Sequence, residues 1–321
     1  MSVIYKKAKE RKPENKSYIA PLIFTILAPV IFVYGLNSLS TNPTIQTKII
    51  NPVKQIIEDY FSPINQIAQK DLFSKPGNYA VVVKNLKTGF TYSKNADLKF
   101  DSASLYKLWV MEETYEQLNE GKLKKTDVIS ADLDELNNTL ETVTPLPTPT
   151  DVLENEQTQP KKIVSFNIED AINSMITVSD NYAALTLVQR IGSKNISDFL
   201  VRNNFSDSEF SSPPLTSARD ISNFYETLYK GKFINKAASK EMMEILKKQE
   251  INDRIPKYLP GGVVTAHKTG ELFGYKHDAG IIFSKRGDLI IVVLTNTIDP
   301  TAAAENIAVF SRDIYSFIDG R

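Results

Sequence analysis

The chain has 321 residues, of which 42% are hydrophobic and 24% are charged, and its formal net charge at pH 7 is zero. This composition is typical of a globular protein with one large domain or two smaller ones. It excludes a nucleic-acid-binding surface built on a basic excess, and it excludes an acidic solvating tail. The chain contains no cysteine, which excludes disulfides, thiol catalysis, Cys-based zinc sites and lipoprotein anchoring.

The N-terminal segment predicts a membrane anchor. Residues 18–39 are nearly all apolar, and about twenty such residues are enough to cross a bilayer as a helix. By the positive-inside rule, residues 1–17 lie in the cytoplasm, because they carry a set of basic side chains: Lys6, Lys7, Lys9, Arg11, Lys12 and Lys16. A cleaved signal peptide is the alternative, but the run is long for one and no Ala-x-Ala follows it. We expect a single-pass protein of the cell membrane whose catalytic domain is extracytoplasmic.

Residues 40–76 are predicted to be a stalk, because Asn-Pro and Ser-Pro pairs punctuate them. A folded domain is expected over residues 77–321. It opens with a buried strand over residues 79–83, followed by a turn and a returning strand over residues 90–92. A helix is then expected to begin at Asp101 or Ser102 and to end near Gly121.

Residues 137–162 interrupt this pattern. They contain a Pro/Thr-rich stretch at 144–149 and a polar run that lacks apolar periodicity. We interpret them as an exposed loop insertion. A linker between two domains is the alternative, although the flanking segments have the patterns of one fold.

The remaining elements indicate the fold class. Helical periodicity recurs between residues 168 and 248, strand-like runs follow between residues 263 and 294, and Asp299-Pro300 opens a last helix. The strands therefore come from both ends of the domain and most of the helices from its middle. This order predicts an α+β fold in which an antiparallel sheet from both ends is flanked by helices and accompanied by an all-helical lobe.

Ser104 and Lys107 lie at the start of the first predicted helix, where a spacing of three residues puts them on one face. A serine hydroxyl is a poor nucleophile at neutral pH. A buried amine within hydrogen-bond reach can take its proton, because burial lowers the pKa of the amine. The helix N-terminus adds free N–H groups near a reacting carbonyl. The pair is therefore a candidate nucleophile and base, although the spacing is common by chance.

Two further motifs follow in order: Ser179-Asp180-Asn181 and Lys268-Thr269-Gly270. With Ser104-x-x-Lys107 they form the set typical of class A β-lactamases and penicillin-binding proteins. Residues 77–321 resemble this family of penicillin-recognising serine acyl enzymes. The resemblance implies the β-lactamase/transpeptidase-like fold and an acyl-enzyme mechanism.

The resemblance also implies a role for each catalytic residue. Ser104 would be the nucleophile, and Lys107 would be the acylation base or part of its proton relay. Ser179 would pass the proton to the leaving nitrogen. Lys268 would add positive potential, and a second cation near Lys107 disfavours the charged form of that amine.

The substrate-binding residues follow from the same resemblance. Asn181 would hold Lys107 and the amide side chain of the substrate, and Thr269 would bind the substrate carboxylate. Gly270 would let the strand approach the ligand. The backbone N–H groups of Ser104 and Glu271 would form the oxyanion hole, where one donor is typically worth about 3 kcal/mol.

The sequence departs from the class A pattern at one point. Class A β-lactamases carry a Glu-x-x-Leu-Asn pattern whose glutamate activates the deacylating water. Residues 203–215 lack this pattern and offer only Glu209, with Asp207 nearby. Glu209 is expected to be a solvated loop residue, so hydrolysis of the acyl enzyme is expected to be slow or to follow another route.

No cofactor and no metal are expected. The only two histidines, His267 and His277, lie ten residues apart, which is a poor metal-ligand pattern. A triad through His277 and Asp278 is conceivable, but no Gly-x-Ser-x-Gly elbow accompanies it. His277 and Lys276 are expected at the rim of the pocket.

Three functions remain open. The first is a membrane-anchored class A β-lactamase-like serine hydrolase that opens β-lactam amides, which the motif spacing and the overall resemblance favour and which we expect. The second is a D-alanyl-D-alanine carboxypeptidase that acts on peptidoglycan stem peptides, which the missing glutamate favours. The third is a non-enzymatic module that binds wall peptides or senses antibiotic, although a pure binder has no need of a nucleophile.

Overall fold

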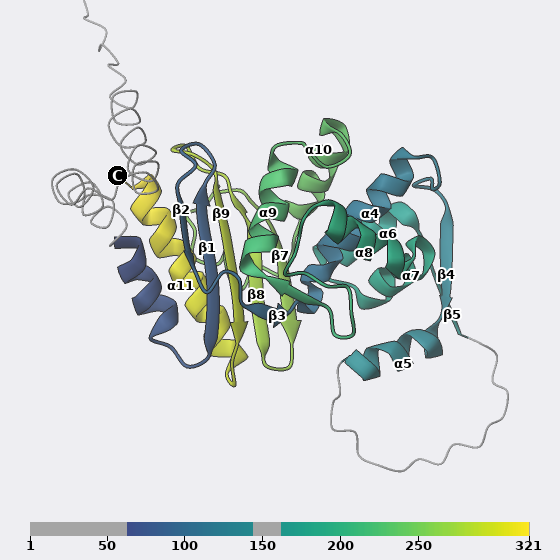
Figure 1. Ribbon diagram of the computed structural model, residues 1–321, viewed down its shortest axis with the longest axis horizontal. Helices are drawn as coiled ribbons and strands as arrows, with labels where there is room; N and C mark the ends of the chain where they lie inside the picture. Colours follow the sequence, from purple (N-terminus) through teal and green to yellow (C-terminus); the bar gives the residue numbers. More distant parts are fainter. Residues whose placement is uncertain (1–62, 144–161, 321) are drawn as a thin grey trace, which may run out of the picture. The chain divides into compact units, whose positions relative to one another are not determined.

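The computed structural model describes residues 63–143 and 162–320 (Figure 1). The predicted cytoplasmic segment and membrane span lie outside these residues, as do most of the predicted stalk and residues 144–161 of the predicted insertion. Within the described ranges, no helix is both long and apolar enough to cross a membrane.

A five-stranded antiparallel sheet joins the two ends of the domain, as the sequence predicts. The strand order is β2-β1-β9-β8-β7. The strands are β1 (Asn78–Asn85), β2 (Thr91–Lys94), β7 (Thr265–Leu272), β8 (Tyr275–Ile282) and β9 (Leu289–Asn296). Strand β1 pairs with β9 along its whole length, from Asn78 opposite Asn296 to Asn85 opposite Leu289. The first and last strands of the domain are therefore neighbours at the centre of the sheet.

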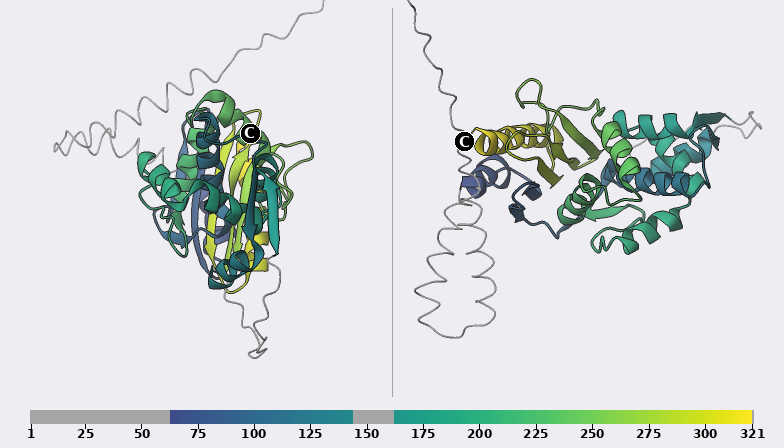
Figure 2. Two further views of the ribbon diagram at one scale, coloured as in Figure 1. Left: turned by 90° about the vertical axis from the view of Figure 1, so that its right-hand side faces the viewer. Right: turned by 90° about the horizontal axis from the view of Figure 1, so that it is seen from above.

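Both faces of the sheet are covered, which explains why residues 79–83 of β1 and 289–294 of β9 are continuous apolar runs. Val81 and Val83 of β1 pack with Ile307 and Phe310 of α11 (Pro300–Asp319). The alternate side chains, such as Val82, face the core that contains α9 (Ala218–Tyr229). Figure 2 shows the strands and α11 toward one end of the molecule and the helical lobe toward the other.

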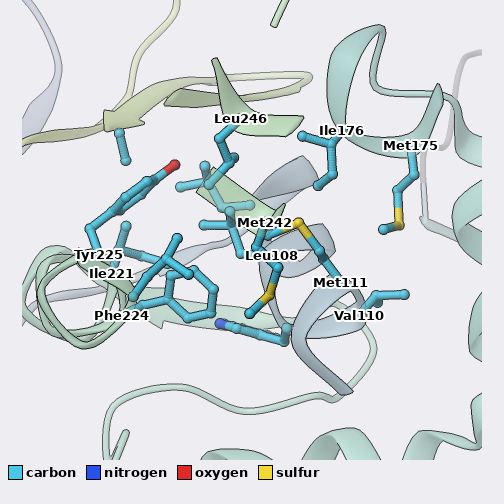
Figure 3. Packing of buried hydrophobic residues seen from close by; sticks show 14 of the residues in the cluster. Leu108, Val110, Met111, Met175, Ile176, Ile221, Phe224, Tyr225, Met242 and Leu246 are labelled. Carbon is cyan, nitrogen blue, oxygen red and sulfur yellow. The ribbon is translucent and has the colours of Figure 1, made fainter. Parts of the chain in front are cut away.

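The helical lobe is organised around α4 (Lys107–Asn119), whose side chains are buried on most sides. Its neighbours are α6 (Ile168–Thr177), α7 (Asn181–Ile191), α8 (Ser193–Arg202) and α10 (Lys236–Leu246). Figure 3 shows Leu108 and Met111 of α4 among Met242, Leu246 and Phe224. A helix that is buried almost all round fixes the position of its first residue, and here that residue is Lys107.

The structure contains four short strands and one helix that were not predicted from the sequence. Strand β3 (Lys99–Asp101) pairs with β6 (Leu215–Ser217), and β4 (Val128–Asp132) pairs with β5 (Ile163–Asn167). Helix α5 (Leu133–Val143) occupies residues 137–143, which the sequence analysis assigned to an exposed loop. That assignment is wrong for these residues, and the fold class is otherwise the α+β arrangement expected.

The folded unit begins at Ile64 and not at residue 77. Residues 64–73 are helical, and Gln69–Phe73 form a π-helical turn, η2. Ile64, Ala68 and Leu72 recur every four residues and are buried against α11 and the sheet. The prediction of a stalk up to residue 76 is therefore wrong from residue 64 onward.

Candidate active site

The first candidate residues lie where a 3₁₀ turn, η3 (Ala103–Tyr106), leads into α4. Ser104 is partly exposed, and Lys107 is completely buried. Because a 3₁₀ turn has three residues, Ser104 and Lys107 lie on the same face. Ala103, just before Ser104, has a φ of 43°, and its N–H donates to Asp101 Oδ1 at 2.8 Å. A non-glycine residue in this left-handed region is strained, and such strain often marks a functional turn.

Gly270 explains how strand β7 can lie against η3. A Cβ atom at this position would be 3.1 Å from Ser102 O, 3.1 Å from His277 Cδ2 and 3.2 Å from Leu105 Cγ. By the resemblance, Gly270 is expected to allow a close approach of the strand to a ligand. The structure shows that the missing side chain first allows the strand to approach the turn that carries Ser104.

Two lysine amines converge on the loop between α6 and α7. Lys107 Nζ donates to Ser179 O at 2.6 Å, to Asn181 Oδ1 at 2.7 Å and to Ser179 Oγ at 3.2 Å. Lys268 Nζ donates to the same Ser179 Oγ at 2.9 Å and to Thr269 O at 2.8 Å. The Ser179 hydroxyl therefore lies between two amines that come from α4 and from β7.

The backbone of this loop is held in one conformation. Ser179 has a φ of 61°, and Asp180 caps α7 by accepting from the N–H of Ala183 at 3.0 Å. The cap fixes the start of α7 and the loop before it. Together these features hold Ser179 and Asn181 toward Lys107.

Burial changes the protonation of both amines. It lowers the pKa of Lys107 to about 7, although the charge of Asp180 acts in the opposite direction. Burial also lowers the pKa of Lys268 well below its ordinary value, and the neighbouring charge of Lys107 lowers it further. An amine with a pKa near 7 is partly neutral at physiological pH, which is what a general base requires.

A second group of charges lies beside Lys268. Arg254 is fully buried, and its Nη2 donates to Glu271 Oε2 at 2.6 Å. Lys276 Nζ lies 2.5 Å from the same oxygen. The charge of Arg254 contributes to lowering the pKa of both Lys268 and His277. Glu271 was expected to act through its backbone N–H. In the structure its carboxylate also forms ion pairs with Arg254 and Lys276.

Arg254 was not found by the sequence analysis. It lies in the irregular segment before β7 and belongs to no motif. Its Nε and Nη1 atoms have no hydrogen-bond partner among the described residues. The sequence does not show that an arginine in a loop will be buried, because its burial depends on the tertiary fold.

The histidines do not form a catalytic triad. His277 Nδ1 accepts from the N–H of Thr295 at 3.0 Å, so its Nε2 donates to Asp101 O at 2.8 Å. Burial lowers the pKa of His277 to about 4, which keeps the ring neutral. Asp278 instead contacts Nδ1 of His267 at 2.9 Å. The expectation that His277 lies at the pocket rim is wrong, because the ring is fully buried under Gly270.

The candidate carboxylates of residues 203–215 point elsewhere. Glu209 forms an ion pair with Lys99 at 2.5 Å and is about half exposed. Asp207 Oδ2 accepts from Ser217 Oγ at 3.3 Å. Within the part of the chain that the structure describes, neither carboxylate bonds to Ser104, Lys107 or Lys268.

Replacing Gly270 by alanine tests the contact between β7 and η3. We expect Gly270→Ala to lower the free energy of unfolding by about 1–3 kcal/mol, because the added methyl group meets a backbone carbonyl. Gly261→Ala is the matched control, since nothing lies within 4 Å of a Cβ there. Denaturant unfolding of both variants measures the difference, and equal stabilities would contradict the packing described.

Comparisons with known proteins agree with this arrangement. Residues 63–318 match the model of the β-lactamase enzyme family. Comparison with curated proteins finds no significant match.

Solved structures show the same fold at low sequence identity. A β-lactamase from Sphaerobacter thermophilus DSM 20745 is 21% identical, with a TM-score of 0.67 over 80% of this chain and 97% of its own. PBP-A is 19% identical, with a TM-score of 0.68 over 81% and 97%. The TLA-1 extended-spectrum β-lactamase is 18% identical, with a TM-score of 0.67 over 80% and 98%. Since the matched segment spans most of the chain, the protein belongs to the β-lactamase enzyme family.

Proposed function

We propose that the protein forms an acyl enzyme through Ser104 and opens the amide bond of β-lactams. The observation that carries this proposal is the Ser179 hydroxyl bonded to both Lys107 and Lys268. This arrangement supplies a partly neutral amine and a hydroxyl that can relay a proton. A structure of a PBP-A variant is an acyl-enzyme complex with penicillin G, which supports the same chemistry for this chain.

In the proposed acylation, Lys107 takes the proton of Ser104 while Ser104 Oγ attacks the lactam carbonyl. The N–H groups of Ser104 and Glu271 stabilise the oxyanion. As the intermediate collapses, the C–N bond breaks and Ser179 gives its proton to the leaving nitrogen. Ser179 takes back the proton that Lys107 removed from Ser104, through the hydrogen bond from Lys107 Nζ to Ser179 Oγ. Hydrogen bonds of catalytic groups often tighten only with substrate bound, so the bonds of Lys107 to the α6–α7 loop are compatible with this role.

Substrate binding is assigned to the edge of the same site. Thr269 would bind the substrate carboxylate, Asn181 its amide side chain, and Lys268 would add positive potential. Gly270 would keep this edge of β7 open. No cofactor takes part in the proposed reaction.

We also propose that residues 18–39 anchor the protein in the cell membrane, with residues 1–17 in the cytoplasm and the catalytic domain outside. The apolar run and the basic residues before it support this placement. It would put the site on the side of the membrane where β-lactams and peptidoglycan occur.

A D-alanyl-D-alanine carboxypeptidase is the second candidate. The observation that favours it is the ion pair of Glu209 with Lys99, which directs this carboxylate away from the role of the deacylating glutamate of class A β-lactamases. The same residues would form an acyl enzyme with a stem peptide, and β-lactams would then act as inhibitors.

Intact-protein mass spectrometry of the full chain in detergent, mixed with benzylpenicillin and sampled over time, tests the proposal. We expect a one-to-one adduct in the parent protein and none in Ser104→Ala. A persistent adduct would indicate the peptidase, and turnover without a lasting adduct would indicate the β-lactamase. Labelling of a correctly folded Ser104→Ala variant would show that Ser104 is not the nucleophile.

The acylation rate is expected to depend on the protonation of Lys107. Because the neutral amine is the active form and its pKa is about 7, the rate should rise with pH, by up to about tenfold per unit below pH 7, and level off above it. Stopped-flow measurement of acylation between pH 5.5 and 8.5 checks this profile. A flat or falling profile would exclude Lys107 as the base.

Removing the charge of Glu271 is expected to strengthen the binding of carboxylate-bearing substrates. Glu271→Gln removes the closer of two carboxylates that pair with Arg254 and Lys276, and leaves Asp253 at 3.5 Å and 3.7 Å from them. We therefore expect the second-order acylation constant for benzylpenicillin to increase by about three- to tenfold. Glu305→Gln, which removes an exposed partner of Lys257, should have no effect. A decrease in Glu271→Gln alone would mean that the carboxylate itself supports the site.

A further inference from the structure

A second cluster of ionisable side chains lies farther along α4. Glu112, Glu113 and Glu116 each present one carboxylate oxygen, and these oxygens lie within 4.8 Å of one another. Glu112 and Glu113 are only 3% and 4% exposed. The Oε2 atoms of both are buried without a hydrogen-bond partner. Buried carboxylate oxygens in this state are costly, and for Glu112 the described side chains supply no hydrogen-bond partner.

One cation from the protein reaches the cluster. Arg202 of α8 bonds through Nη2 to Glu116 Oε2 and lies 3.5 Å from Glu113 Oε2. Gln117 donates to Glu113 Oε1 at 2.9 Å. Glu112 receives no hydrogen bond from any described residue, and one guanidinium cannot balance three carboxylates.

The cluster is open to solvent on one side. A cavity of about 390 Å³ is lined by Glu112 and Glu116 together with Arg202, Asn203 and Lys232. It is large enough for a hydrated ion to enter and for water to complete its coordination. The side chain of Arg202 is half exposed, so it can turn toward solvent and leave the carboxylates to a bound ion.

We propose that Glu112, Glu113 and Glu116 form a binding site for a divalent, oxygen-preferring cation, with Ca²⁺ as the best fit. Ca²⁺–O bonds measure about 2.3–2.6 Å, so two ligands of one ion can be at most about 5 Å apart. The spread of the three oxygens meets this limit. Ca²⁺ also accepts irregular geometry and water ligands more readily than Mg²⁺ does.

The site is separate from the reaction but lies on the same helix. Lys107 is the first residue of α4, and Glu112 follows it by five residues. Cation binding would stabilise the helix that holds Lys107 in place.

The single tryptophan of the chain provides a direct probe. Trp109 precedes Glu112 by three residues and Glu113 by four, so the three side chains share one helix face. Tb³⁺ binds Ca²⁺ sites and emits when a nearby indole transfers excitation energy to it. We expect the full chain in detergent to give saturable Tb³⁺ emission on excitation of Trp109, and we expect Ca²⁺ to displace it.

Variants distinguish the site from adventitious binding. Glu112→Gln and Glu116→Gln should each reduce the emission at least tenfold. Glu120→Gln is the matched control, since Glu120 lines the same cavity. It should not reduce the emission, because Glu120 pairs with Lys122. Circular dichroism checks that each variant is folded. If Glu112→Gln does not fold, Glu116→Gln still tests the site.

A second measurement uses Ca²⁺ itself. Saturating Ca²⁺ should raise the Tm of the parent protein by about 5 °C, and it should leave Glu116→Gln unchanged. The absence of Tb³⁺ emission and of a Ca²⁺-dependent Tm in the parent would overturn the proposal. It would also be overturned if Glu120→Gln lost the emission to the same degree as Glu116→Gln.

Discussion

Two lysine amines lie within hydrogen-bond reach of one serine hydroxyl, and neither can be fully charged there without cost. Lys107 and Lys268 both donate to Ser179 Oγ, and burial opposes the charged form of each. The mutual repulsion is set by how closely α4 and β7 approach. The protonation behaviour of the site therefore depends on a packing distance between a helix and a strand.

The rest of the domain maintains that distance. Helix α4 is enclosed by four helices, so its first residue has little freedom. Strand β7 is held by β8 along its length and reaches η3 closely because residue 270 is glycine. The neutral ring of His277 lies against Gly270 and links β9 to the backbone of Asp101 through hydrogen bonds of its two nitrogens. Each support comes from a different part of the chain.

The sequence predicts the parts of this arrangement that are local. The spacing of Ser104 and Lys107, the cap at Asp180 and the apolar strands are all visible within short windows, and the sheet from both ends follows from their order. What could not be predicted depends on tertiary contacts. The burial of Arg254 and its contact with Glu271 arise only when the segment before β7 folds over the sheet.

Other errors have simpler physical reasons. Helix α5 has apolar residues at helical spacing, at Leu133, Leu136, Leu140 and Val143, and the predicted loop was begun at residue 137, inside that pattern. Strands β4 and β5 carry exposed apolar residues, Val128 and Ile163, which obscure the alternation expected of a half-buried strand. The helix at residues 64–73 has a regular apolar spacing, but the prolines before it suggested a stalk. For β4 and β5 the pairing of the two strands determined the structure more than the local pattern did.

The pairing of β1 with β9 has a consequence for how the protein comes to be folded. These two strands are adjacent in the sheet, but they are the first and the last of its strands in the sequence. Contacts of such long sequence separation form slowly, because a large loop must close first. A growing chain cannot complete the sheet until its last strand has been synthesised. Fragments that lack the C-terminal strands would leave β1 with only β2 beside it, so activity should appear only in the finished chain and not gradually with length.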